Sequence, residues 1–243
     1  MQAWGLTDVG CVRAQNQDHY GILAPSEEWL LAVVCDGMGG AKSGNVASRL
    51  ACEVFSEEVK RSFRLNMTPS EAERMLRSAA KLANVSVFEH SQLSEEYSGM
   101  GTTLVAALVY PKATLILNIG DSRAYHVNAD GVACITVDHS VVQLMVQRGE
   151  LTPEQAKTHP SKNLITRAVG PSAQVLADVF QPKVQKGDCL LLCTDGLSNQ
   201  MADQEILFEI VHGARKDDCC QRLLEIAKER GAPDNVTSVM VEI

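Results

Sequence analysis

The sequence contains no long hydrophobic segment and no export signal. None of its apolar runs approaches the roughly 18 uninterrupted apolar residues that a membrane-spanning helix requires. The N-terminal stretch 1–8 has no basic region followed by an apolar core, which a secretory signal would need. We therefore expect a cytoplasmic protein that has no membrane partner.

The sequence also lacks any Cys-x-x-Cys pair, the spacing on which most cysteine-based zinc sites are built. It has eight cysteines in all. Most of them lie within apolar runs, where a thiol packs as a small hydrophobic group, and we expect burial of Cys35, Cys52, Cys134, Cys189 and Cys193. This usage indicates a reduced chain without disulfides.

Basic clusters, repeats and linkers are missing as well. There is no dense run of Lys and Arg, and the formal net charge of −8 argues against nucleic acid as a partner. No internal repeat, low-complexity stretch or long linker divides the 243 residues, of which 45% are hydrophobic. Because a chain of this size can bury one large core, we expect residues 1–243 to form a single domain.

Short apolar, β-branched segments predict buried strands, and paired amphipathic helices separate them. The strands are expected at 30–35, 103–109, 114–119, 190–193 and 236–241. The helices are expected over 46–55, 72–83, 203–212 and 217–230. The second helix is preceded by Thr68-Pro69-Ser70-Glu71, a capping sequence with proline at the first helical position. Strands and helix pairs do not alternate strictly, so an α+β fold is favoured over a doubly wound parallel sheet.

Aspartates lie at the ends of several predicted strands. Asp36, Asp121 and Asp195 each follow an apolar run, and Asp234 precedes another. If the sheets open on one edge, these carboxylates converge, and only bound cations would offset their mutual repulsion. The pattern therefore predicts a metal site built from oxygen ligands.

Asp-Gly is also a common hairpin signal, and the chain contains this pair at three places in its sequence. Asp130-Gly131 lies between two short apolar runs of matching length, which predicts a plain hairpin. Asp36-Gly37 and Asp195-Gly196 do not lead straight into a partner strand. For these two pairs a turn and a metal ligand both remain open on spacing alone.

A set of short motifs runs through the chain in a fixed order. They are RAQNQD at 13–18, DGMGG at 36–40, GTT at 101–103, NIGDSRAY at 118–125, TVDHS at 136–140, ITRAVG at 165–170, CTDGLSN at 193–199 and DN at 234–235. Together they resemble the ordered motifs of the metal-dependent PP2C-type (PPM) protein phosphatases in their bacterial single-domain form. The resemblance spans nearly the whole chain.

The resemblance implies a fold, a cofactor and an activity. The fold is a four-layer α-β-β-α sandwich of two antiparallel sheets flanked by helix pairs. The cofactor is a binuclear Mn²⁺ or Mg²⁺ centre at one edge of the sandwich, and hard oxygen ligands without clustered His or Cys agree with these ions. The activity is hydrolysis of phosphoserine and phosphothreonine in proteins, by direct attack of a water that the two metals activate.

The resemblance also assigns metal ligands, position by position. Asp36 would bridge both ions, and the carbonyl of Gly37 would bind one of them. Asp195 and Asp234 would hold the other ion. Asp121, together with Asp195, would bind a third and weaker ion.

Two further residues are expected to support the chemistry. Arg13 would bind the phosphate through its guanidinium fork, with an ordinary surface arginine as the alternative. Asp18 would orient the centre from behind the ligands or bind through a metal-held water. For Asp121, an ion pair with Arg123 or a turn cap is the alternative to a metal-binding role.

The sequence departs from the family pattern at two positions. Met38 occupies the place where eukaryotic members carry a histidine proposed as general acid, and Ala41 occupies a place where bacterial relatives often have one. A thioether cannot donate a proton, so the leaving group would be protonated by a metal-held water or its protonation would matter little. His139, between Asp138 and Ser140, is expected to be structural, because consecutive residues cannot form a catalytic triad.

Residues of about 140–166 are expected to form a flap that contacts protein substrates, with a short helix after the capping sequence Thr152-Pro153. The expected partners are phosphorylated proteins, including a Ser/Thr kinase or its substrates, and the chain is expected to be a monomer. One alternative function is a catalytically weak phosphoprotein-binding signalling module on the same fold. A hydrolase of small phosphoesters or nucleotides is the other, although no Walker-type phosphate loop is present.

Overall fold

The computed structural model describes residues 1–39, 43–213 and 215–243. Its strands form two sheets in which the neighbouring strands pair antiparallel. The first sheet has the order β1 (Gln2–Asp8), β11 (Val236–Glu242), β10 (Cys189–Cys193), β7 (Arg123–Asn128) and β8 (Gly131–Cys134). The second has the order β2 (Asp18–Ser26), β3 (Trp29–Met38), β5 (Leu104–Tyr110), β6 (Ala113–Ile119) and β9 (Asp178–Phe180), and the short β4 (Gly101–Thr102) pairs with the end of β3.

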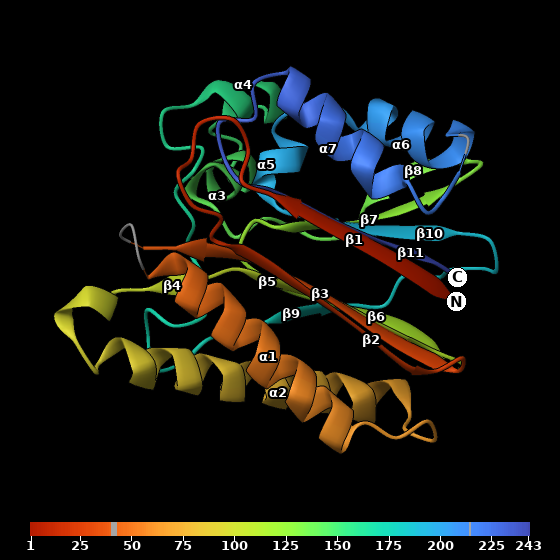
Figure 1. Cartoon of the computed structure of the whole chain (residues 1–243), viewed down its shortest axis with the longest axis horizontal. Coiled ribbons are helices and arrows are strands. Elements are labelled where there is room, and N and C mark those ends of the chain that lie inside the picture. Colours follow the sequence, from red (N-terminus) through yellow and green to blue (C-terminus); the bar gives the residue numbers. More distant parts are fainter. Residues whose placement is uncertain (40–42, 214) are drawn as a thin grey trace.

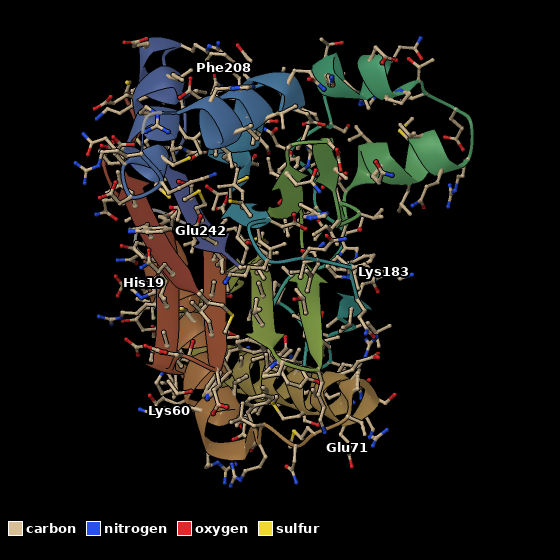
Figure 2. All side chains as sticks on the ribbon, turned by 90° about the vertical axis from the view of Figure 1, so that its right-hand side faces the viewer. His19, Lys60, Glu71, Lys183, Phe208 and Glu242 are labelled. Atoms are coloured by element: carbon tan, nitrogen blue, oxygen red, sulfur yellow. The ribbon has the colours of Figure 1, made fainter. Side chains whose placement is uncertain are left out.

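Helix layers cover the outer faces of the two sheets (Figure 1). The long helices α1 (Gly44–Ser62) and α2 (Pro69–Ser91) pack on the second sheet, and η1 (Glu95–Tyr97) follows them. The helices α5 (Asp195–Ser198), α6 (Asp203–His212) and α7 (Cys219–Glu229) pack on the first sheet. Figure 2 shows Phe208 on one outer layer and Lys60 and Glu71 on the opposite one. The predicted α-β-β-α sandwich is therefore confirmed.

The interior strand β3 shows why the core lies on both sides of a sheet. Leu31, Val33 and Cys35 face α1 and α2, whereas the alternate residues of the strand face the other sheet. Because both faces are buried, the strand reads as a continuous apolar run and not as an alternating one. This run ends at Asp36, where the sandwich opens.

The predicted elements are present, most with nearly the predicted bounds, although α1 and α2 extend well beyond the expected 46–55 and 72–83. The helix α6 coincides with the expected 203–212, and Thr68 caps α2 in a capping box with Glu71. The hairpin at Asp130 is confirmed, although its two central residues are Ala129 and Asp130, because Asn128 pairs with Gly131. Of the cysteines expected to be buried, Cys134 is exposed, since β8 is a short edge strand.

Besides the two-residue β4, three strands were not predicted, and each lies at the edge of a sheet. They are β1, β2 and β9. Most side chains of these strands are only half-buried, so their sequences carry no continuous apolar run. Asp18, the last residue of the motif RAQNQD, is the first residue of β2.

The flap (residues 140–166) contains α3 (Val141–Gln147) and α4 (Pro153–Thr158). Its two ends meet at the base, where Ser140 and Ile165 form an isolated β-bridge. In Figure 2 the two helices, drawn in green, extend beyond one side of the sandwich. No helix within the described ranges is both long and apolar enough to cross a bilayer.

Candidate functional site

The ends of strands from both sheets surround one pocket of about 240 Å³ at the edge of the sandwich. Asp36, Asp121, Asp195 and Asp234 all line it, and so does Arg13. These carboxylates come from four separate parts of the chain. The convergence predicted from the strand ends is therefore present in the folded structure.

Asp36 is held by its backbone on both sides. Its N–H donates to Oγ1 of Thr103 over 2.9 Å, and its carbonyl accepts from Oγ1 of Thr102 over 2.8 Å and from the Thr103 N–H over 2.9 Å. These bonds fix the end of β3 and aim the side chain into the pocket. Burial, together with the charges of Asp18 and Asp195, raises the pKa of Asp36 well above its usual range.

Glycine is the only residue type that fits at position 37, because neighbouring backbone atoms leave no room for a side chain. A Cβ atom there would lie 2.2 Å from the carbonyl oxygen of Gly44 and 2.4 Å from that of Gln17. Both are backbone atoms, so no side-chain rotation would relieve the clash. The close approach leaves the Gly37 backbone at the wall of the pocket.

Asp195 follows β10 and Asp234 precedes β11, and these two strands are neighbours in the first sheet. Asp195 begins α5 and accepts a hydrogen bond from Nδ2 of Asn199 over 3.0 Å. Burial, and then the charge of Asp234, raise the pKa of Asp195. Asp234 accepts from the guanidinium of Arg13 over 2.7 Å.

Asp18 lies behind the pocket and not on its surface. It faces Asp36 across the β2–β3 pairing and is only 7% exposed. Its Oδ2 accepts hydrogen bonds from Oγ1 of Thr194 (2.9 Å) and of Thr237 (2.7 Å), which tie it to the ends of β10 and β11. Burial outweighs these bonds and raises the pKa of Asp18 to about 7.

Arg13 lies on a loop that Asn235 holds in place. The Asn235 amide donates to the carbonyls of Val9 and Gln15, each over 2.9 Å, and its Oδ1 accepts from the Gln17 N–H over 2.8 Å. The sequence motif included Asn235, but no role was predicted for it. The only indication in the sequence was its position directly after Asp234, which places the residue that holds the loop next to a pocket carboxylate.

Asp121 does not form the ion pair that was the alternative to metal binding. Arg123 instead donates to Asp138 over 2.7 Å. Burial, followed by the charges of Asp195 and Asp138, raises the pKa of Asp121 to about 7. Its carboxyl therefore belongs electrostatically to the pocket.

His139 is structural, as predicted. It is 6% exposed, its Nδ1 accepts from the Gly120 N–H over 3.1 Å, and its Nε2 lies 2.9 Å from Asp178. Since Nδ1 accepts a hydrogen bond, Nε2 carries the proton and donates a hydrogen bond to Asp178. Neither His139 nor Asp138 lines the carboxylate pocket.

The flap and Met38 complete the pocket wall. Asn163 and Ile165 reach it from the base of the flap, and neither was predicted as a site residue. Met38 also lines it and has no proton to donate. Gly40 and Ala41 lie outside the described residues, so the expectation for Ala41 has no structural counterpart here.

The donor set fits hard divalent cations. Buried carboxylates whose pKa values rise through burial and through one another gain from nearby positive charge. No group of three His, Cys, Asp or Glu in the described ranges forms a preassembled metal cage. Mg²⁺ and Mn²⁺ suit such an open oxygen site, because Mg²⁺ keeps several of its waters when it binds a protein.

Comparisons with known proteins identify the family to which this four-layer sandwich, with its converging carboxylates at one edge, belongs. The sequence profile of the protein phosphatase 2C family matches residues 12–235. The serine/threonine phosphatase stp of Listeria innocua is 35% identical over 243 residues, covering 100% of this chain and 96% of the relative. The protein phosphatase PhpP of Streptococcus pneumoniae is 32% identical over 98% of this chain and 96% of its own length.

Solved structures show the same similarity. The serine/threonine phosphatase Stp1 from Staphylococcus aureus superposes with a TM-score of 0.92 at 37% identity, covering 100% of this chain and 94% of that one. The phosphatase PstP/Ppp of Mycobacterium tuberculosis superposes with a TM-score of 0.87 at 32% identity, covering 100% and 98%. This chain belongs to the protein phosphatase 2C family, whose members are metal-dependent serine/threonine phosphatases.

Proposed function

We propose that this chain removes phosphate from phosphoserine and phosphothreonine in protein substrates, using two divalent cations, Mn²⁺ or Mg²⁺, in the carboxylate pocket. The observation that carries the proposal is the convergence of Asp36, Asp121, Asp195 and Asp234 with Arg13 in one pocket. The relatives with this fold are named serine/threonine phosphatases, which supports phosphoproteins as the substrate class.

Asp36, Asp195, Asp234 and the carbonyl of Gly37 are the proposed ligands of the two ions, and Asp121 with Asp195 is the proposed site of a third, weaker one. When bound, the cations would supply Lewis-acid charge that activates water and offsets charge on the phosphoryl group. Asp18 positions the ends of β2, β10 and β11 through Thr194 and Thr237.

Arg13 is the proposed phosphate ligand. A guanidinium donates to two phosphate oxygens at once and stays charged at every relevant pH. Its bond to Asp234 keeps it beside the pocket, and the Asn235 bonds keep its loop in place. Met38 donates no proton, so we propose that water in the pocket protonates the leaving serine or threonine oxygen, on which a loose transition state builds up negative charge.

We further propose that residues 1–243 form one catalytic domain, that it acts as a monomer in the cytoplasm, and that its partners include a Ser/Thr kinase or the substrates of one. The flap is the proposed contact with these protein substrates. Its base contributes Asn163 and Ile165 to the pocket, which supports this role.

Phosphate release from a phosphothreonine peptide tests the proposal. With Mn²⁺ present we expect turnover that a chelator abolishes and that Asp195→Asn lowers by at least about 100-fold. Asp130→Asn is the matched control, because Asp130 also belongs to an Asp-Gly pair but lies in an exposed hairpin. Calorimetry should show that Mn²⁺ binds to the wild-type protein. Binding without turnover would favour the phosphoprotein-binding module instead.

A further inference from the structure

A second pocket adjoins the carboxylate pocket. It has a volume of about 340 Å³ and shares Met38 and Ile165 with its neighbour. We call it the adjoining pocket. Six of the ten described residues that line it are apolar, namely Met38, Ile165, Ala168, Pro171, Val175 and Leu176, and the other four are polar or charged.

The wall of the adjoining pocket is held firmly in place. The buried Asn84 on α2 accepts from the Gly170 N–H over 2.8 Å and donates to the carbonyl of Ser172 over 2.9 Å. Gly170 has φ +107°, and a Cβ atom there would lie 2.4 Å from the Val87 side chain. Val169 bonds to Thr102 in both directions, over 2.8 and 2.9 Å. A loop anchored at this many points presents a preformed surface.

The charge of the adjoining pocket does not favour an acidic occupant. Arg167 is the only charged residue among the described residues that line it. Its guanidinium donates to Asp178 over 3.0 Å, which offsets its charge. Leu176 at the rim is 72% exposed and offers apolar surface to whatever enters. An apolar side chain therefore matches the lining best.

We propose that the adjoining pocket binds an apolar side chain of the phosphoprotein substrate, located one or two residues from the phosphorylated residue. This inference rests on the proposed function, which places the phosphoryl group in the carboxylate pocket. The adjoining pocket shares two wall residues with the carboxylate pocket. An extended peptide advances about 3.3 Å per residue, so a side chain one or two residues from the phosphorylated residue can reach it. Its volume of about 340 Å³ leaves room for an apolar side chain.

Paired phosphothreonine peptides test this subsite. The parent peptide carries serine at both positions on each side of the phosphothreonine, and each variant peptide replaces one serine with leucine. For the wild-type protein with Mn²⁺, we expect leucine at one position to raise kcat/KM about tenfold over serine. In Leu176→Gln this ratio should fall to about twofold, because a polar rim no longer covers the leucine.

Leu65→Gln is the matched control. Leu65 is also an exposed leucine, and it lies in the loop between α1 and α2 at the opposite end of the sandwich from the flap (Figure 1). This variant should keep the tenfold ratio. Melting curves of both variants would show that each folds, which is expected because both side chains are exposed.

The possible outcomes separate the two proposals. Hydrolysis of every peptide at the same rate, or a ratio that Leu176→Gln leaves at its wild-type value, would overturn the subsite alone. No hydrolysis of any peptide, with Mn²⁺ bound, would overturn the proposed function and the subsite with it. A preference for leucine that is lost in Leu176→Gln and kept in Leu65→Gln supports the subsite.

Discussion

At the scale of single residues, the ion pair between Arg13 and Asp234 links the proposed phosphate ligand to a proposed metal ligand. The pair is half-exposed, with side-chain exposures of 55% and 38%, so it contributes little to stability. The pair matters because it holds the Arg13 guanidinium beside the pocket. When a cation binds Asp234, the carboxylate gains a competing partner and the guanidinium becomes available to a phosphate.

Arg13→Ala should therefore affect activity much more than folding. We expect kcat/KM for a phosphothreonine peptide to fall about 10- to 100-fold, while the free energy of unfolding changes by less than about 0.5 kcal/mol. Steady-state kinetics measures the change in kcat/KM, and urea unfolding measures the change in the free energy of unfolding. Arg61→Ala is the control, since Arg61 is also exposed and paired with a carboxylate, Glu58. Unchanged kinetics in Arg13→Ala would make Arg13 an ordinary surface residue.

The buried carboxylates predict an unusual pH dependence for the metal-free protein. The pKa of Asp18 and that of Asp121 are each raised to about 7, chiefly by burial. Between about pH 4 and pH 7 the folded state then binds more protons than the unfolded state, so stability falls as pH rises through this window. The loss should be several kcal/mol, since raising the pKa of one buried carboxyl from 3.8 to about 7 corresponds to about 4 kcal/mol.

Unfolding in the presence of a chelator, at about pH 5 and about pH 7.5, measures this loss. In Asp121→Asn the slope should be smaller, because one titrating carboxyl is absent. Added Mn²⁺ should restore stability at the higher pH by binding the folded state. A metal-free protein that becomes more stable over the same window would contradict the proposed electrostatics.

At the scale of secondary structure, two helices carry the same capping box but differ in what they bury. In α2, Thr68 and Glu71 cap a helix whose buried residues belong to the core. In α4, Thr152 and Gln155 form the same motif on a helix with no buried residue. Capping stabilises global folding only where the helix end is part of the cooperative unit.

Thr68→Ala should lower the free energy of unfolding by about 1 kcal/mol. Thr152→Ala should leave global unfolding nearly unchanged, because fraying of α4 exposes no core. Chemical denaturation reports the global effect, and amide hydrogen exchange reports local opening of each helix. Equal losses in the two variants would mean that the flap unfolds together with the sandwich.

The sequence allowed prediction of the elements whose residues are buried on a whole face or on both faces. Strand β3, with its apolar run before Asp36, and the helix at 203–212 are examples, since a continuous apolar run marks the first and a helical stripe the second. The edge strands β1 and β2 were not predicted, because half-buried residues leave no such pattern. For the pocket, the carboxylates were predicted from strand ends. Asn235 and the Asn84 anchor were not, since the residues that they bond lie far away in sequence, and Asn163 was not predicted as a lining residue.

At the scale of the whole molecule, the flap is an attachment with a narrow base. The Val141 N–H donates to the Leu164 carbonyl over 2.8 Å, and the Thr166 N–H donates to the His139 carbonyl over 2.7 Å. In its two helices only Val142 is buried. The sandwich core lies in other parts of the chain.

Replacing residues 141–164 with a short Gly-Ser linker should therefore leave one cooperative unfolding transition, with a melting temperature close to that of the wild type. Since the proposed metal ligands and Arg13 lie outside this segment, turnover of a small aryl phosphate with Mn²⁺ should stay within about threefold of wild type. The ranking of a set of phosphopeptides should change, because the flap is the proposed contact with protein substrates. An unchanged ranking would show that the sandwich edge alone selects the substrate, and loss of the cooperative transition would show that the flap is part of the folding unit.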